Sequence, residues 1–221
     1  MPIRAVLFDI DGTLIDSNDL HAEAWDEAFR RFGQHVPLPV IRGQIGKGGD
    51  NLMPALLPAE FVEAQGEALE KARGELFKAD YLPRVRPFPG VRPLFERLRA
   101  DDRRIVLASS GNREEVDHHI GLLEIADLID GSTTADDAEH SKPDPDIFAA
   151  ALKQAGVSAA QALVVGDTPY DVRAAQKIDL RTIALRCGGF DEAALREAGA
   201  VELWDDPADL LANYDCSLIS R

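Results

Sequence analysis

Two aspartates, Asp9 and Asp11, stand two positions apart in LFDIDGTLID, where an apolar run near the N-terminus ends. Like charges at the end of a buried strand raise each other's pKa unless a cation compensates them. Other apolar runs also end in polar side chains: Ser109 and Ser110 follow RIVLA, and Asp167 follows ALVVG. Carboxylates and hydroxyls in this pattern indicate a site that uses a cation to act on an anion.

Lys142 and Asp171 complete the candidate set. Asp171 follows Asp167 by four residues, and Lys142 lies in the loop segment HSKPDPD. Ligands bind at the carboxyl ends of strands in an open parallel sheet, so we expect all these residues to converge at one edge. Clustered carboxylates suit Mg²⁺, which also recruits phosphate oxygens. Lys142 and the Ser109 hydroxyl would hold a phosphoryl group, helped by backbone N–H groups near Gly111.

Such a site can transfer a phosphoryl group through a covalent aspartyl-phosphate. One aspartate attacks phosphorus, while Mg²⁺ and Lys142 neutralise the charge on the phosphoryl oxygens. A second acid two residues later can protonate the leaving alcohol and then deprotonate the water that releases phosphate. Asp11 is expected just past the strand end, where Gly12 allows the chain to turn.

Five apolar, β-branched runs indicate the strands that would hold these residues. They are Ala5–Ile10, Arg104–Ser109, Leu128–Thr133, Ala162–Gly166 and Arg181–Leu185. Helical patterns lie between them, among them residues 91–100 and Glu114–Leu123. The alternation predicts an α/β fold with a doubly wound, Rossmann-like parallel sheet.

The best-signalled helix is residues 144–155. Asp144 is expected as its N-cap, Pro145 at its first position and Gly156 just past its end. Ser158 and Gln161 form a capping box before the next strand.

Residues 16–87 break the alternation, because they contain helical patterns and no convincing strand. Ser17–Phe32 places His21 and Trp25 on one helical face. Ala59–Tyr81 is long enough for a helix of about 34 Å. The expected organisation is an α/β core of residues 1–15 and 88–221 with a helical domain of residues 16–87 inserted into it.

The composition limits the classes of molecule that the protein is expected to bind. The formal net charge is −15, from 24 Lys+Arg against 39 Asp+Glu, which disfavours nucleic acid and acidic membrane surfaces. No apolar run approaches the ~18 residues of a membrane span, and MPIRAVLFDI has no signal-peptide pattern. We therefore expect a cytoplasmic protein, a monomer or homodimer, in which Cys187 and Cys216 are reduced.

Four segments together resemble a known family. DIDGTL (9–14), LASS (107–110), SKPDPD (141–146) and GDTPYD (166–171) resemble, in order and spacing, the motifs of the haloacid dehalogenase superfamily. The resemblance covers the whole chain, and the inserted helices look like that family's small helical cap.

The resemblance implies a role for each matched residue. Asp9 would be the nucleophile, Asp11 the general acid/base, and Ser109 a phosphate ligand. Lys142 would neutralise the phosphate and orient Asp9. Phosphatases and phosphomutases of the superfamily carry an aspartate at the position of Asp11, whereas dehalogenases lack it, so carbon–halogen chemistry is not expected.

The resemblance also implies a metal site. Asp9, the backbone carbonyl of Asp11, and Asp167 would hold Mg²⁺. Asp171 would support the site, although it is also placed to cap the helix that follows it.

Other candidates have two open interpretations. Ser110 and Asn112 either contact phosphate or belong to an ordinary turn. His21 either faces the site or packs beside Trp25 in the cap core. The glycine-rich segment 43–52 is either a turn between cap helices or a specificity loop from which Lys47 reaches a distal anionic group. His118 and His119 are expected to be solvated.

The sequence thus predicts a Mg²⁺-dependent phosphatase acting on a small phosphorylated metabolite. One alternative is a phosphomutase resembling β-phosphoglucomutase, which shares the HxxxW spacing of His21 and Trp25. The corresponding cap loop GKGGDN lacks the arginine that such enzymes carry. Another alternative is a receiver-like phospho-signalling module, although receivers lack helices inserted after the first strand.

Overall fold

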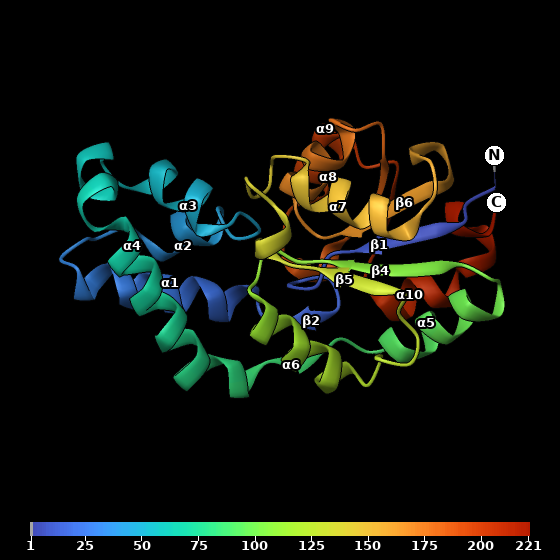
Figure 1. Ribbon diagram of the computed structural model, residues 1–221, viewed down its shortest axis with the longest axis horizontal. Helices are drawn as coiled ribbons and strands as arrows, with labels where there is room; N and C mark the ends of the chain where they lie inside the picture. Colours follow the sequence, from blue (N-terminus) through green and yellow to red (C-terminus); the bar gives the residue numbers. More distant parts are fainter. Residues whose placement is uncertain (1) are drawn as a thin grey trace.

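The computed structural model describes residues 2–221 and folds them around a six-stranded parallel sheet (Figure 1). The strand order is β5-β4-β1-β6-β7-β8. The strands are β1 (Ala5–Phe8), β4 (Arg104–Ala108), β5 (Gly131–Thr133), β6 (Ala162–Gly166), β7 (Arg181–Leu185) and β8 (Glu202–Trp204). The predicted α/β fold is confirmed. The sequence analysis missed β8, because its three residues carry too short an apolar run.

Helices cover both faces of the sheet, which is why β1 is buried along its whole length. Val6 and Phe8 belong to the apolar cluster on one face, and Ala5 and Leu7 to the cluster on the other, as the two-residue period of a strand requires. The first cluster includes side chains of α5 (Val91–Ala100), α6 (Arg113–Leu123) and α10 (Pro207–Ala212). The second includes those of α7 (Asp146–Ala155) and α8 (Pro169–Gln176), and α9 (Glu192–Ala198) contacts α8.

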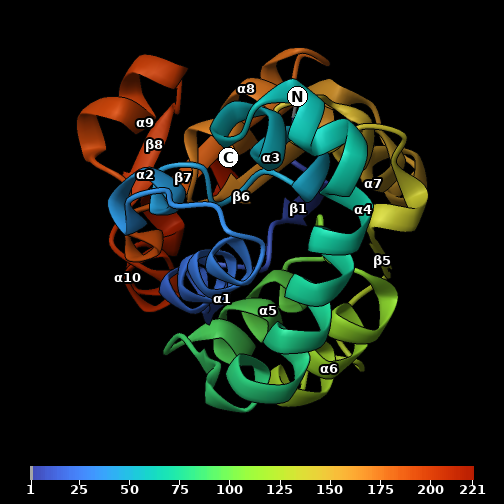
Figure 2. The same cartoon turned by 90° about the vertical axis from the view of Figure 1, so that its left-hand side faces the viewer.

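Residues 16–87, called here the helical segment, lie beyond the carboxyl end of β1 (Figures 1 and 2). Their helices are α1 (Asn18–Arg31), α2 (Leu38–Arg42), α3 (Gly49–Leu56) and α4 (Ala59–Leu76). They share an apolar core of their own, which includes Trp25, Phe29, Leu52 and Leu69. The chain leaves and re-enters the sheet region through β2 (Ile15–Asp16) and β3 (Arg86–Pro87), a short antiparallel pair that the sequence did not predict.

Two helix boundaries differ from the prediction. The long helix is α only to Leu76 and continues as a π-helical turn, Phe77–Tyr81. The helix expected from Asp144 begins at Asp146, with Pro145 at the N-cap position. The N–H of Asp144 donates to the carbonyl of Ser141 (3.0 Å), so Asp144 belongs to the preceding turn.

Two further expectations can be compared with the structure. The capping box of Ser158 and Gln161 is present before β6. Cys187 and Cys216 are both free thiols.

Within residues 2–221, no helix combines the length and the apolar character needed to cross a membrane.

Candidate active site

Asp9 lies directly after β1, and its N–H still pairs with the Val165 carbonyl of β6 (2.9 Å). The Lys142 ammonium forms a hydrogen-bonded ion pair with Oδ1 of Asp9. The same Nζ lies 2.7 Å from Oδ1 of Asp171. All three side chains are buried. One ammonium therefore bridges two carboxylates that follow different strands of the sheet.

Asp167 and Asp171 follow β6, and neighbouring side chains orient both carboxylates. Oδ1 of Asp167 accepts from the Thr13 hydroxyl (3.0 Å), and Oδ2 accepts from Nδ2 of Asn18 (2.7 Å). Oδ2 of Asp171 accepts from the N–H (3.0 Å) and the hydroxyl (2.7 Å) of Thr168. Asp171 therefore caps α8 and also faces the site, so both interpretations of this residue fit its position.

Gly12 makes the turn that carries the chain away from β1. Its φ is +76°, a conformation that glycine adopts easily and other residues rarely do. A Cβ atom here would lie 2.1 Å from Nδ2 of Asn18 and 2.4 Å from Oδ2 of Asp167. A larger residue at this position would displace the groups that orient the site.

Burial and mutual repulsion perturb the carboxylates. Burial raises the pKa of Asp9 to about 7, although the positive charge of Lys142 acts to lower it. The negative charge of Asp171 adds to the rise. Burial also raises the pKa of Asp167, to which the charges of Asp171 and Asp9 contribute. Burial alone would lower the pKa of Lys142, but the charges of Asp171 and Asp9 raise it above its ordinary value. Two of these three buried carboxylates pair with one ammonium, and with all three ionised the cluster carries two surplus negative charges.

These carboxylates fit a divalent cation. One oxygen from each of Asp9, Asp167 and Asp171 lies within 4.8 Å of the other two. An all-oxygen set with two surplus charges suits a hard cation such as Mg²⁺. The carboxylate of Asp11 is not part of this cluster. This agrees with the expected ligand set, in which Asp11 contributes its backbone carbonyl.

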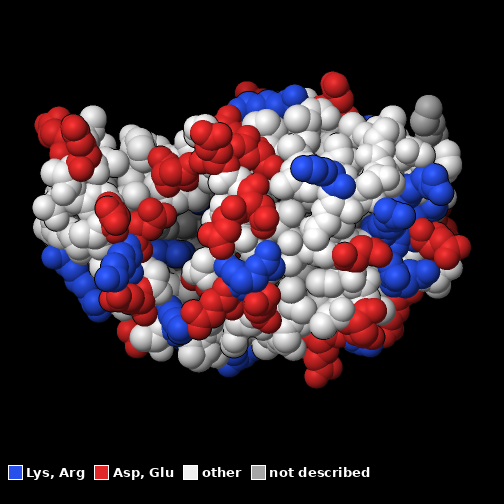
Figure 3. Space-filling view, in the orientation of Figure 1, with Lys and Arg blue, Asp and Glu red and all other residues white. Residues whose placement is uncertain are grey.

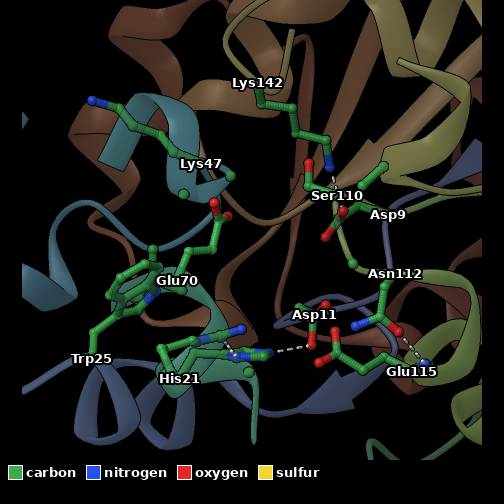
Figure 4. Close-up of a pocket in the computed structure, with 18 residues that line it drawn as sticks. Asp9, Asp11, His21, Trp25, Lys47, Glu70, Ser110, Asn112, Glu115 and Lys142 are labelled. Carbon is green, nitrogen blue, oxygen red and sulfur yellow. Dashed lines mark hydrogen bonds and ion pairs between the residues drawn. The ribbon is translucent and has the colours of Figure 1, made fainter. Parts of the chain in front are cut away.

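The Asp11 side chain points instead toward the helical segment (Figure 4). Its Oδ1 accepts from the Ser17 hydroxyl (2.7 Å) and pairs with Nε2 of His21 (2.8 Å). Burial opposes ionisation, but the charge and hydrogen bond of His21 hold the pKa of Asp11 well below its ordinary value. His21 stacks on Phe77 with 4.0 Å between ring centroids, and Nδ1 contacts the Arg73 guanidinium. His21 therefore faces the site.

A cavity of about 230 Å³ separates the helical segment from the carboxyl ends of the strands (Figure 4). The ionisable, polar and aromatic side chains that line it are Asp9, Asp11, His21, Trp25, Lys47, Glu70, Arg73, Ser110, Asn112, Glu115 and Lys142. The hydroxyl of Ser110 is buried and has no protein partner among the described residues. It is therefore free to hydrogen-bond a ligand.

Ser109 and Asn112 are the other residues predicted to contact phosphate. Ser109 is buried behind the cavity wall, where its hydroxyl accepts from the N–H of Gly111 (3.0 Å). Asn112 lines the cavity and also caps α6, because its Oδ1 accepts from the N–H of Glu115 (2.9 Å).

The segment 43–52 turns from α2 into α3 and contributes residues 45–49 to the cavity lining. The contact of Lys47 with a distal anionic group stays a prediction. Its ammonium donates to Oε1 of Gln44 (2.6 Å) and lies 4.8 Å from the ring centroid of Tyr170. Figure 4 shows this side chain pointing away from Asp9.

Several residues around the site were not anticipated. Thr13 lies within a recognised motif, so its position was the available signal. Glu70, Arg73 and Glu115 reach the cavity from helices whose sequence pattern does not distinguish them. His119 was expected to be solvated but is only 1% exposed, because α6 packs this face on the sheet side.

Comparison with known proteins agrees with this geometry. A sequence model of the haloacid dehalogenase-like hydrolases matches residues 3–179. The chain is 30% identical to the Arabidopsis thaliana chloroplastic protein SUPPRESSOR OF QUENCHING 1, covering 96% of this chain but only 20% of that much longer protein. It is 29% identical to the validoxylamine A 7'-phosphate phosphatase of Streptomyces hygroscopicus, covering 88% and 91% of the two chains. The crystal structure of a Pseudomonas syringae hydrolase superposes with a TM-score of 0.90 at 31% identity, covering 97% and 98%.

Proposed function

Because the chain belongs to the haloacid dehalogenase-like hydrolase family, we propose that it is a Mg²⁺-dependent phosphatase acting on small phosphomonoesters. One observation carries the proposal. Three buried carboxylates, two of them paired with the single ammonium of Lys142, lie beside a cavity between the sheet and the helical segment. Relatives named as phosphatases support the same reaction class.

Asp9 is the proposed nucleophile. An oxygen of its carboxylate attacks phosphorus, the bond to the leaving oxygen breaks, and an aspartyl-phosphate forms. Lys142 orients Asp9 and offers positive charge to the phosphoryl oxygens. The unpartnered hydroxyl of Ser110 donates to one of these oxygens, and Ser109 holds the turn that presents Ser110.

Asp11 and His21 are proposed to manage the proton. Protonated Asp11 donates its own proton to the leaving alcohol oxygen, and Nε2 of His21, 2.8 Å from Oδ1, orients the carboxyl group through a hydrogen bond. Asp11 then removes a proton from water, the water oxygen attacks phosphorus, and inorganic phosphate leaves. This second attack regenerates the carboxylate of Asp9.

Asp9 and Asp167, with the Asp11 carbonyl and the support of Asp171, are the residues we propose for holding Mg²⁺. When bound, the cation would offset the negative charge that develops on the phosphoryl oxygens. The helical segment is proposed to act as a cap domain that excludes bulk water from the cavity. A cavity of about 230 Å³ favours small substrates over proteins.

The test is phosphate release from a panel of small phosphomonoesters with the wild-type protein and with Asp9→Asn. Release that requires both Mg²⁺ and Asp9 is the expected result. Asp16→Asn, an exposed aspartate on β2, serves as the matched control and should retain activity. Absence of release from every ester by a folded, Mg²⁺-loaded protein would refute the proposal.

The alternatives receive less support. The hydrolase family match favours turnover over the long-lived phosphorylation of a receiver-like module. A phosphomutase must also hold a second phosphate, and the ammonium of Lys47 is engaged by Oε1 of Gln44. The cytoplasmic location and the monomeric or homodimeric state stay predictions from the sequence.

A further inference from the structure

The end of the cavity nearest the helical segment carries two carboxylates. Glu70 of α4 and Glu115 of α6 both line the cavity, and Figure 4 shows them on opposite sides of its interior. Glu115 is only 8% exposed. Among residues 2–221, neither carboxylate forms an ion pair. Their acceptor oxygens are therefore available to a bound molecule.

The cations of the cavity do not balance this charge. Lys142 is engaged by two aspartates at the opposite end, and the Lys47 ammonium points away. Apart from His21, which is paired with Asp11, Arg73 is the remaining basic side chain at this end. Its guanidinium lies 5.3 Å from the ring centroid of Trp25 and 4.9 Å from that of Phe77. Two carboxylates thus face one guanidinium, which leaves this end of the cavity negatively charged.

The opening of the cavity is acidic as well. An adjoining hollow shares Glu70 with the cavity and is also lined by Asp50 and Glu139. Figure 3 shows acidic side chains above and beside the hollow between the helical segment and the sheet, and basic side chains at its lower edge. An anionic group placed here would meet repulsion at the entrance and at the inner end.

We infer that the site selects phosphomonoesters whose leaving group offers hydroxyl donors and has no second anionic group, an inference that rests on the phosphatase function proposed above. Glu70 and Glu115 are the specificity-determining residues, because their carboxylates accept hydrogen bonds from hydroxyls and repel a second carboxylate or phosphate. Trp25, which also lines the cavity, supplies an apolar surface for the carbon skeleton.

The experiment compares esters that differ only in one terminal group. sn-Glycerol 1-phosphate is paired with 3-phospho-D-glycerate, and sorbitol 6-phosphate with 6-phosphogluconate, so that CH₂OH is exchanged for carboxylate. We expect kcat/KM to be higher for the alcohol in each pair by about tenfold or more, as repulsion between partly buried charges predicts. A carboxylate ester hydrolysed as efficiently as its alcohol partner overturns the inference.

Variants test the assignment to the two glutamates. Glu70→Gln combined with Glu115→Gln keeps side-chain shape but removes both charges, and should bring the alcohol-to-carboxylate ratio close to one. The control combines Glu67→Gln and Glu114→Gln on the same helices. Glu67 and Glu114 are exposed and do not line the cavity, so this variant should keep the wild-type ratio.

The outcomes separate the two proposals. An unchanged ratio in the Glu70 and Glu115 variant overturns the role of these residues, provided its thermal unfolding matches that of wild type. p-Nitrophenyl phosphate reports the basic reaction. If neither it nor any other ester is hydrolysed, the phosphatase function fails. If it is hydrolysed and the carboxylate esters are preferred, only the selectivity inference fails.

Discussion

At the scale of single residues, the site is defined by an excess of buried negative charge. Asp9, Asp167 and Asp171 cluster together, Lys142 pairs with the first and the last of them, and Asp11 forms a separate pair with His21. Removing carboxylates from water disfavours their charged forms, so the folded chain holds them at a cost in stability. A bound cation would offset that cost. Two predictions test this description.

The first prediction concerns stability and pH. The pKa of Asp9 is raised by burial from 3.8 to about 7, so the folded protein binds a proton that the unfolded chain releases between these values. The free energy of unfolding should therefore fall as pH rises from about 4 to 7, by about 2–4 kcal/mol. The lowered pKa of Asp11 stabilises the folded protein at pH values above 3.8, the ordinary pKa of an aspartate. This contribution is lost only as the pH falls below 3.8, so it does not affect the slope between pH 4 and 7.

Denaturant unfolding in EDTA at several pH values measures this slope, and Asp9→Asn should flatten it. Added Mg²⁺ should raise stability more at pH 8 than at pH 5, because protons compete with the cation. Equal stabilisation at both pH values would contradict the assignment of the cation to this cluster.

The second prediction concerns His21. His21→Gln can still hydrogen-bond to Asp11 but carries no positive charge. The pKa of Asp11 should then rise toward its ordinary value, moving the acidic limb of the kcat profile to higher pH. His118→Gln changes an exposed histidine and is the matched control. A pH profile that does not move would show that His21 is not what lowers the pKa of Asp11.

At the scale of elements, the first turn of α3 is tied to the loop that carries Lys142. The N–H of Gly48 donates to Oγ of Ser141 (2.9 Å), and Nδ2 of Asn51 donates to the Ser141 carbonyl (2.9 Å). The N–H of Ser141 donates in turn to Oδ2 of Asp50 (3.0 Å). These bonds join the helical segment to the sheet domain beside Lys142.

The third prediction follows from this junction. Ser141→Ala removes the hydroxyl that both Gly48 and Asp50 contact, so the helical segment should close less firmly over the substrate. We expect KM to rise up to about tenfold, the upper end of what one hydrogen bond contributes, with a smaller change in kcat. Ser132→Ala is the control, because its hydroxyl contacts Arg113 instead (2.7 Å). Steady-state kinetics of both variants measure KM and kcat. An unchanged KM for Ser141→Ala would contradict the prediction.

At the scale of the whole molecule, the net charge of −15 opposes the approach of an anionic substrate. The local positive charge of Lys142 is buried, so it does not attract substrate at long range. Added salt screens the repulsion between the acidic surface and the substrate over distances of about 10 Å.

The fourth prediction is that salt accelerates the reaction. With Mg²⁺ saturating, kcat/KM for a phosphomonoester should rise about two- to threefold between low and physiological NaCl. The measurement is a series of initial rates at low substrate concentration, with sucrose at equal osmolarity as control. A fall in kcat/KM over this range would indicate that local positive charge governs association instead.

The sequence by itself determined five of the six strands of the parallel sheet, the helical segment between the first two motifs and the positions that meet at the sheet edge. Asp9, Lys142, Asp167 and Asp171 could be identified because each belongs to a short local pattern beside a predicted strand. Parallel strands align their carboxyl ends, so that pattern alone implied that these side chains would converge.

Only the tertiary structure decided how the helical segment faces that edge. The direction of Lys47, the burial of Ser109 behind Ser110, and the entry of Glu70 and Glu115 into the cavity depend on contacts between segments far apart in sequence. A helical period marks which face of α4 or α6 is apolar, but not which polar residue meets a cavity. That choice is made when the two parts of the molecule pack together, because only then are the distances between their charges defined.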